Sequence, residues 1–581
     1  MRIVLARTAG FCMGVKRAMD QVLSLAGRAQ PPLYTYGPLI HNRQVVGMLE
    51  ARGICARTDF GDSEQGTVLL RAHGVPPDVA DSLRAAGLAV EDGTCPHVLR
   101  GQRSIARRSA EGYETVIVGD RDHDEVVGLA GHAKGPCHII ASVDDARTVP
   151  LGDRVLVVAQ TTFNLALFEQ IVAELRARKP DVEIVASICS ATSERQEEAR
   201  ELAQRVDAMI VVGGSHSANT RRLAEIAAET GTPTFHVETA DELDVNRIAG
   251  YRTVGVTAGA STPSWITSTV IDRLHRAAAA RSPWTRLASA AASVAFDGNL
   301  YVAAGAAALT YAVTRLLGLG LGDWWGRASL MIAAFGYIFA AYSLGRRAED
   351  PAGGLGLTRR VAFYRAHPRW FGAACALLGA ASIAVLVPFG LVAVALLGLS
   401  YAMALAYGLL VSPRRPRWLT RLRNIPASKD LFAAAGWTVA VVLVPAVAAR
   451  GGSVYGVVAA AAFVFGMAFI RSVMFDFTDV TADRLLGRDT LPALLGVARA
   501  RAALAVLAGA LLVLLGAGAA AGVFGGRSAL AGWLVLCPAY VLGYLTVFER
   551  SVTASERRCG VVVDGGMLLA GAIALAFAHL G

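Results

Sequence analysis

Apolar and polar positions divide this 581-residue chain into two halves with different periodicity. In the first half, short apolar runs end in Gly, Thr, Ser, His or Asp and alternate with amphipathic segments such as 15–29 and 220–231. The runs are 1–6, 66–74, 114–120, 154–162, 207–214 and 253–261. This alternation predicts βα units with largely parallel sheets. From about residue 290 onward, charges become sparse and the apolar stretches lengthen.

Three isolated cysteines lie at predicted loop-to-helix junctions. They are Cys12 in GFCMGVKRA, Cys95 in DGTCPHV and Cys189 in SICSATSERQ. A helix N-terminus favours a thiolate, and ligands of parallel sheets bind beyond the carboxyl ends of the strands. Cys55 and Cys137 lie in strand-like surroundings and are interpreted as ordinary packed thiols. The chain has no CxxC pair, which disfavours a structural zinc site. Purely structural cysteines and an iron–sulfur cluster with one open iron remain as alternatives.

Nine short motifs in the first half occur in the same order as in a known protein family. They are GFCMGVKRA, YGPLIHN, RAHGVP, DGTCPHV, DHDEVVG, AQTTFN, ICSATSERQ, GGSHSANTRRL and VTAGASTP. Over residues 1–275 the chain therefore resembles the 4-hydroxy-3-methylbut-2-enyl diphosphate reductases of the methylerythritol phosphate route to isoprenoids. The resemblance implies three α/β domains around a central [4Fe–4S] cluster held by Cys12, Cys95 and Cys189. It also implies reductive loss of a hydroxyl, which gives isopentenyl and dimethylallyl diphosphate.

The same resemblance assigns the substrate residues. It places His41, His73, Ser217, Asn219 and Ser261 on the diphosphate, which needs charge-assisted and hydroxyl donors. Ala218 stands where the family often has a second serine, and a backbone N–H is expected to serve there.

Glu125 matches the proton source and Thr161 the residue that links it to the substrate. We expect His123 and Glu125, two residues apart, to face the pocket from an extended stretch. Because GGSHSAN lacks the GxGxxG spacing of a dinucleotide site, the electrons are expected from a ferredoxin- or flavodoxin-type donor.

Nine apolar stretches follow a predicted linker at 276–294, and most approach the ~20 residues that span a bilayer. They lie near 298–316, 328–345, 370–387, 390–410, 431–449, 455–474, 502–524, 529–548 and 561–580. Alternate loops hold 19 Lys and Arg residues, against three in the other loops. Basic residues mark the cytoplasmic side, and MRIVLARTAG has too short an apolar run for a signal peptide. These features predict nine spans in the cell inner (plasma) membrane, a cytoplasmic first half and contact with membrane lipids. The net charge of +10 suits an anionic membrane face, and no nucleic-acid partner is expected.

The loop after the sixth stretch is acidic. Asp476, Asp479 and Asp483 stand at i, i+3 and i+7, which predicts one helical face. Clustered carboxylates suit Mg²⁺, which in turn binds diphosphate. With Gly487 and Thr490-Leu491-Pro492, the stretch resembles the second aspartate-rich motif of the UbiA-like intramembrane prenyltransferases. The resemblance implies diphosphate contacts from Arg423 and Lys429 in the preceding basic loop.

The first aspartate-rich motif of that family is altered here. The corresponding stretch reads YSLGRRAEDPAGG, with Gly345 in place of Asn, Glu349 in place of the first Asp, and Asp350 as the candidate replacement. Two hypotheses follow for the membrane half, a prenyltransferase with an unknown acceptor or an inactive anchor. Asp297 and Asn299 are candidates for the acceptor pocket.

The predicted organisation is therefore a reductase domain at 1–275, a linker at 276–294, and an all-α nine-helix bundle at 295–581. A third hypothesis concerns the reductase half, whose three cysteines would then hold a structural metal and reduce nothing.

Overall fold

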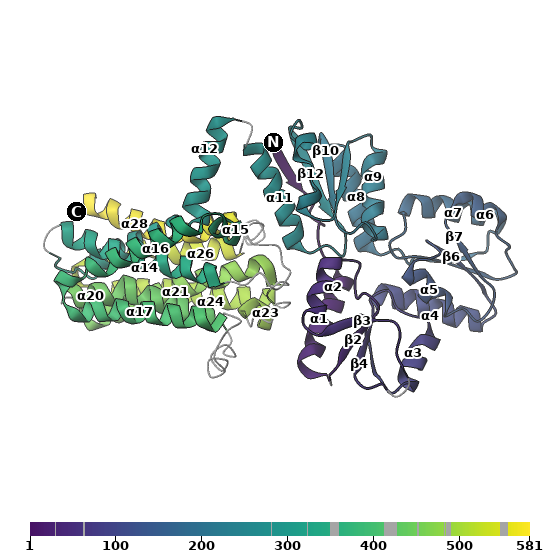
Figure 1. Ribbon diagram of the computed structural model, residues 1–581, viewed down its shortest axis with the longest axis horizontal. Coiled ribbons are helices and arrows are strands. Elements are labelled where there is room, and N and C mark those ends of the chain that lie inside the picture. The colour runs from purple at the N-terminus through teal and green to yellow at the C-terminus, as the bar shows by residue number, and fades with distance from the viewer. Residues whose placement is uncertain are drawn as a thin grey trace. The chain divides into compact units, whose positions relative to one another are not determined.

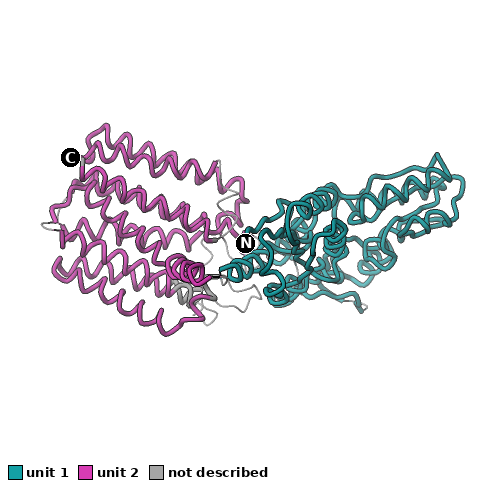
Figure 2. The backbone as a smooth tube through the Cα atoms, turned by 90° about the horizontal axis from the view of Figure 1, so that it is seen from above, with its two compact units in different colours: residues 1–280, 353–356 teal, residues 281–352, 357–581 magenta. Residues whose placement is uncertain are grey.

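The computed structural model describes residues 1–29, 31–61, 64–279, 282–321, 324–348, 359–411, 427–449, 452–480, 483, 490–546 and 556–580. The chain forms two compact units (Figure 2). The first runs from Met1 to Ala280, and the second contains the described residues from 282 onward. Each unit is described by itself.

The first unit contains three four-stranded sheets, and every strand pair is parallel (Figure 1). The first sheet has the order β1(Arg2–Leu5)-β12(Thr253–Ala258)-β10(Ala208–Val212)-β11(Thr234–Val237). The second has the order β3(Ile54–Arg57)-β2(Leu33–Tyr36)-β4(Thr67–Leu70)-β5(Ala89–Asp92). The third has the order β7(Cys137–Ile140)-β6(Glu114–Val118)-β8(Val155–Ala159)-β9(Glu183–Val185). The prediction of parallel βα units is confirmed.

Helices connect the strands within and between these sheets. They are α1(Met13–Arg28), α2(Arg43–Glu50), α3(Pro77–Ala85), α4(Pro96–Ala110), α5(Asp124–Ala130), α6(Val143–Thr148), α7(Leu165–Arg178), α8(Ser190–Ala203), α9(Ala218–Glu229), α10(Val245–Ile248) and α11(Ser264–Ala279). Because β1 pairs with β12, the first strand of the unit completes the sheet built from its last segment. The two ends of the unit are thus joined in one sheet.

All six predicted runs contain strands, namely β1, β4, β6, β8, β10 and β12. Strands β4, β8 and β10 are buried at every position, which explains their continuous apolar runs. The sequence analysis missed six strands, and five of them lie at sheet edges. An edge strand such as β9 is only half-buried, so its sequence carries polar residues and a weak pattern.

The second unit is helical, and each of the nine predicted apolar stretches falls on a helix. The helices are α13(Leu300–Leu316), α14(Trp324–Ala348), α16(Pro368–Ala384), α17(Leu391–Val411), α19(Ser428–Thr438) continuing as α20(Val444–Ala449), α21(Val454–Asp476), α24(Val497–Ala520), α25(Ser528–Leu534) with α26(Leu536–Thr546), and α28(Glu556–Leu580). Within the described ranges, seven are long and apolar enough to cross a membrane, while α13 and the described part of α17 fall short. Nine spans therefore stay a prediction.

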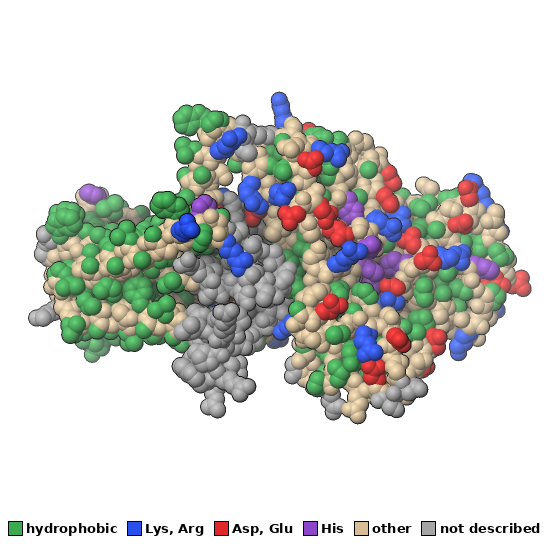
Figure 3. All heavy atoms as spheres, viewed as in Figure 1, with side chains coloured by type: hydrophobic (Ala, Val, Ile, Leu, Met, Phe, Trp, Pro, Cys, Tyr) green, Lys and Arg blue, Asp and Glu red, His purple; other side chains and the backbone are tan. Residues whose placement is uncertain are grey.

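The surface of the second unit is apolar. Hydrophobic side chains cover the face of this unit seen in Figure 3, whereas Lys, Arg, Asp and Glu gather over the first unit. Leu377 on α16, Leu391 on α17 and Val506 on α24 are each more than 70% exposed. Soluble proteins rarely expose contiguous apolar surface of this kind. The second unit thus has the helices and the surface of a multi-pass membrane protein.

Candidate functional site

The three singled-out thiols occupy equivalent places in the three sheets. Cys12, Cys95 and Cys189 are the N-cap residues of α1, α4 and α8, and each follows a strand of a different sheet. The Sγ of Cys12 accepts from the backbone N–H of Val15 at 3.4 Å. The thiol of Cys95 lies within electrostatic range of those of Cys12 and Cys189. The three sheets therefore bring their capping thiols to one centre.

Glycine at position 14 lets two of these sulfurs lie close to the backbone of α1. A Cβ on Gly14 would lie 2.7 Å from the Sγ of Cys95 and 3.9 Å from that of Cys12. Burial raises the pKa of Cys95, while backbone N–H groups of α4 lower it. Three sulfur donors at helix N-termini, beside a position only glycine fits, suit an iron–sulfur cluster with three protein ligands.

Each thiol residue is also tied to a loop that carries a candidate substrate residue. The backbone N–H of Cys12 donates to Ala260, next to Ser261, at 3.1 Å. The N–H of Cys95 donates to Ala72, next to His73, at 2.9 Å. The N–H of Cys189 donates to the carbonyl of Thr161 at 3.1 Å. The sulfur centre and the substrate residues thus form one site.

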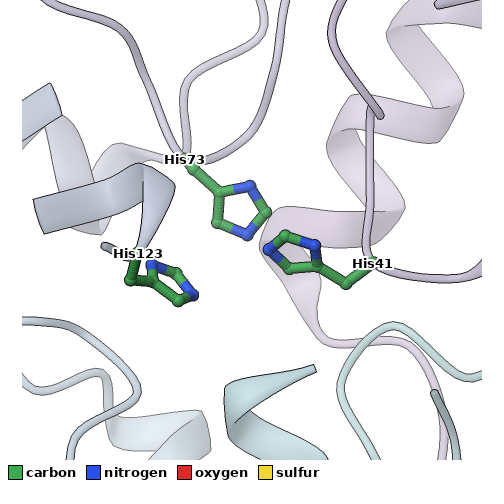
Figure 4. A group of neighbouring side chains, drawn as sticks. All are labelled: His41, His73 and His123. Carbon is green, nitrogen blue, oxygen red and sulfur yellow. The ribbon is translucent and has the colours of Figure 1, made fainter. Parts of the chain in front are cut away.

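Three histidines lie together in this site (Figure 4). His41 precedes α2, His73 follows β4, and His123 caps α5. Ring centroids are 4.4 Å apart for His41 and His73, 5.6 Å for His41 and His123, and 5.5 Å for His73 and His123. Burial lowers the pKa of all three, to about 4 for His123, so the rings are neutral at pH 7.

Two ring nitrogens in this group have no hydrogen-bond partner among the described residues. The backbone N–H of Glu125 donates to Nδ1 of His123 at 3.1 Å, so a neutral His123 carries its proton on Nε2. Nε2 of His41 and Nδ1 of His73 are buried without a partner. Imidazole nitrogens within 4.8 Å of one another are able to hold a metal ion. They are equally able to donate to an anion, and the neighbouring residues favour the second use.

The residues next to the three histidines lie at or just before the N-termini of helices. Ser217 is the N-cap of α9, and Ala218 and Asn219 open that helix. Nδ2 of Asn219 is buried without a partner, and Ser261 is buried as well. A Cβ on Gly214, in the preceding loop, would lie 3.2 Å from the carbonyl oxygen of His41. Free N–H groups at a helix start bind phosphate readily, so Ala218 needs no hydroxyl to contribute.

Glu125 is the buried carboxyl of the site. It is 1% exposed, and Thr161 donates to it twice, from its backbone N–H at 2.6 Å and from its hydroxyl at 2.8 Å. Burial raises the pKa of Glu125 to about 7 despite these bonds. The expectation of an extended stretch was wrong, because Asp124–Ala130 is a helix and Glu125 lies in its first turn. His123 caps that helix, and its Nδ1 accepts from the backbone N–H of Glu125.

A second polar group lies in the helical unit, where α19 begins and α21 ends. Nζ of Lys429 contacts Oδ1 of Asp476 at 2.5 Å. The hydroxyl of Ser472 donates to Oδ1 of Asp430 at 2.5 Å, and Oδ2 of both aspartates is buried without a partner. The regular helix ends at Asp476 and a 3₁₀ turn, Phe477–Asp479, follows. Val480 and Asp483 are helical again and residues 481–482 lie outside the described residues, so a shared face for Asp476, Asp479 and Asp483 stays a prediction.

Of the other residues predicted for that half, some are described by the structure and some are not. Asp483 is buried. Glu349, Asp350, Arg423 and the side chain of Asp479 lie outside the described residues. Asp297 pairs with Arg557 at 3.1 Å, and Nδ2 of Asn299 donates to the hydroxyl of Tyr364 at 2.8 Å. These contacts join helices, and an acceptor pocket at Asp297 and Asn299 stays a prediction.

Sequence reasoning missed a buried ion pair between spans. Arg471 of α21 pairs with Asp564 of α28 and donates to the hydroxyl of Tyr342 at 2.8 Å. Both charged side chains are almost fully buried. A charge inside an apolar stretch is costly and marks a specific partner, so Arg471 within 455–474 and Asp564 within 561–580 were the available signal.

The first unit is a three-sheet α/β fold in which half-buried thiols, half-buried histidines and one buried carboxyl lie in one site, a donor set that suits a metal group and an anionic ligand. The sequence pattern of the LytB protein family matches residues 3–275. The chain belongs to this family.

Individual proteins are similar to one or the other half of the chain. The 4-hydroxy-3-methylbut-2-enyl diphosphate reductase of Trichlorobacter lovleyi is 45% identical over 276 residues, which cover 48% of this chain and 98% of that protein. The reductase of Geobacter sulfurreducens is 44% identical and covers 47% of this chain and 97% of its own length. Among solved structures, a diphosphate reductase of Plasmodium falciparum is similar with TM-score 0.46 and 28% identity, covering 49% of this chain and 89% of its own. A UbiA homolog of Aeropyrum pernix is similar with TM-score 0.37 and 19% identity, covering 47% and 98%.

Proposed function

We propose that residues 1–275 catalyse the reductive dehydroxylation of 4-hydroxy-3-methylbut-2-enyl diphosphate to isopentenyl and dimethylallyl diphosphate. One observation carries the proposal. Three capping cysteines converge, and the backbone N–H of each donates to a loop that holds a candidate substrate residue. This arrangement couples an electron source to a substrate pocket.

The side chains divide the work between binding and proton transfer. His41, His73 and His123, with Ser217, Asn219, Ser261 and the N–H of Ala218, bind the diphosphate. Cys12, Cys95 and Cys189 hold the [4Fe–4S] cluster, which supplies single electrons taken from a ferredoxin- or flavodoxin-type donor. Because burial raises the pKa of Glu125 to about 7, this group carries a proton that it is able to donate.

The reaction balances with two electrons and two protons. The allylic C–O bond breaks, one proton joins the departing hydroxyl to make water, and the other joins the allylic carbon. Glu125 delivers the proton that joins the departing hydroxyl, and the second proton comes from solvent. Thr161 fixes the position of the Glu125 carboxyl through two hydrogen bonds. Protonation at either end of the allylic system gives the two products.

The test is turnover by the full chain, purified anaerobically in detergent and given a strong reductant. We expect a brown chromophore near ~400 nm, typical of a thiolate-bound iron–sulfur cluster, and both five-carbon diphosphates. Cys95→Ser should lose chromophore and products, while Cys137→Ser, on edge strand β7, should keep both. A wild-type chain that binds no iron, or binds it without turnover, would contradict the proposal.

For the helical unit we propose transfer of a prenyl group from its diphosphate to an acceptor, with Mg²⁺ held at Asp476, Asp479 and Asp483. The pair between Lys429 and Asp476, beside buried aspartate oxygens without partners, supports a diphosphate site. Arg423, Glu349 and Asp350 are proposed to complete it. The unit is proposed to span the inner membrane as residues 295–581, after the linker 276–294, with the reductase on the cytoplasmic side.

Prenyl transfer is tested in membranes that contain the full chain, a labelled prenyl diphosphate and Mg²⁺. Asp476→Ala should abolish labelled lipid products. Tyr455→Phe, an exposed position at the other end of α21, should leave them unchanged. Equal product levels from wild type and Asp476→Ala would favour an inactive anchor.

A further inference from the structure

One buried cation beside the sulfur centre has no role in the mechanism so far. Arg195 lies on α8, the helix that Cys189 caps, and its side chain is 5% exposed. Its Nη1 donates to the carbonyl of Ala258 at 3.2 Å, at the end of β12. Two residues further on, the carbonyl of Ala260 accepts from the N–H of Cys12. The guanidinium thus lies between two of the three ligand-bearing segments.

The charge of Arg195 is not neutralised locally. Among the described residues, no carboxylate forms a salt bridge with its guanidinium, and Nε is buried without a partner. Glu198 lies in electrostatic range, but it accepts from the backbone N–H groups of Arg7 and Thr8 at 2.7 and 2.8 Å. Glu194 is exposed, where water screens its charge.

The thiols of Cys12 and Cys189 are the other titratable neighbours of Arg195. Burial lowers the pKa of Arg195, and Cys12, Glu198 and Cys189 act in the opposite direction. An arginine side chain stays protonated in proteins, so a positive charge persists in a buried place. A buried charge is expensive unless something compensates for it. Thiolate-bound iron would do so.

We propose that Arg195 is a positioning residue that stabilises the reduced state of the [4Fe–4S] cluster, and this rests on the proposed reductase function. One electron passes from the external donor to the cluster, so the assembly of cluster and three thiolates becomes more negative by one charge. The guanidinium keeps its proton and its place throughout. A fixed positive charge in a low-dielectric setting favours the more negative state, and charge and hydrogen bonding near the sulfurs are known levers on cluster potentials.

The experiment measures the reduction potential of the cluster by anaerobic titration with electron paramagnetic resonance detection, in the full chain. Arg195→Gln removes the charge, Arg195→Lys keeps it, and Arg200→Gln removes a partly exposed arginine of the same helix. We expect at least a tenfold loss in the equilibrium constant for reduction in Arg195→Gln, which is a fall of about 59 mV for one electron. Arg195→Lys and Arg200→Gln should stay within threefold of wild type, with iron content unchanged in all three variants.

Three outcomes would overturn the assignment. The first is an unchanged potential in Arg195→Gln with full iron content. The second is loss of iron in Arg195→Gln alone, which would assign the arginine to holding the thiolates. The third is loss of iron in both Arg195 variants, which would make it a folding residue. Because the readout needs no substrate, failure here is separable from failure of the reductase function, in which the wild type itself binds no cluster or does not turn over.

Discussion

Burial decides what the carboxyl of Glu125 is able to do. A solvated glutamic acid is ionised at pH 7 and has no proton to give. Here, enclosure raises the pKa of Glu125 to about 7, although two bonds from Thr161 stabilise the ionised form. The same side chain therefore becomes an acid near neutral pH.

Glu125→Gln should lower kcat by about 10²–10⁴-fold, the usual contribution of a general acid. In the wild type the protonated form is the active one, so kcat should fall as pH rises through about 7. The measurement is kcat against pH in anaerobic assays, with the chromophore as a check on cluster content. A Gln variant that keeps the wild-type rate would remove Glu125 from the mechanism.

Thr161→Val provides the matched control for that profile. It removes the hydroxyl that donates to Oε2 and keeps the backbone N–H that donates to Oε1. Losing a bond to the ionised form raises the pKa of Glu125, so the fall in kcat should move to higher pH. A shift to lower pH would contradict this electrostatic account.

At the scale of elements, helix starts carry the chemistry. Cys12, Cys95, Cys189, His123 and Ser217 are all N-cap residues. A cysteine followed by proline or by an amphipathic run indicates the start of a helix, so the positions of the three capping cysteines could be predicted from the sequence. The convergence of the five caps does not follow from local patterns, because it depends on how the sheets pack, and only the family resemblance predicted it for the three cysteines.

Gly14→Ala should impair cluster loading. The added Cβ would approach the Sγ of Cys95 to 2.7 Å, and α1 begins one residue earlier, so neither side is free to move. Gly47→Ala, in the middle of α2 with open space around it, should load normally and gain about 0.5–1 kcal/mol of stability. Iron and sulfide content per chain distinguish the two, and equal loading would show that the cradle is not needed.

In the helical unit, α21 and α28 are joined by the pair of Arg471 and Asp564. Arg471→Met leaves a buried carboxylate unpaired and should cost about 3–5 kcal/mol. The double variant Arg471→Met/Asp564→Leu replaces both charges and should regain most of that loss. Thermal unfolding in detergent measures both, and a double variant as unstable as the single one would assign the cost to lost packing.

The acidic site of this unit was only partly predictable. Asp476 was predicted because it belongs to a cluster of carboxylates at the end of an apolar stretch, and Lys429 because its basic loop resembles that of the UbiA-like family. Asp430, next to Lys429, carries the same signal and was passed over, since no motif included it. Its burial against Ser472 is a tertiary contact between α19 and α21 that sequence spacing does not contain.

For the whole molecule, composition alone separated the two units, because lipid-facing helices and water-facing sheets need different surfaces. What composition does not give is the number of spans. Helix α13, with 17 residues, is shorter than a typical membrane-spanning helix. A helix of this length is close to the minimum that crosses a bilayer, so its length alone does not decide the number of spans.

The two units should unfold separately. Removal of iron by a chelator under reducing conditions should lower the Tm of the reductase transition, because the cluster binds only the folded state. The transition of the helical unit should stay in place, since the three thiols and their sheets all belong to the first unit. Calorimetry of the full chain in detergent, with and without chelator, tests this. A parallel shift of both transitions would mean that the units stabilise each other.

The capping thiols have a consequence for biogenesis. Each thiol belongs to a sheet that is complete only when its own strands have paired, and the first sheet needs strands from both ends of the unit. Binding of the proposed cluster therefore requires that the whole unit has been synthesised. A nascent or truncated chain that lacks β12 presents at most two properly placed ligands, so only a fully translated reductase unit is able to mature.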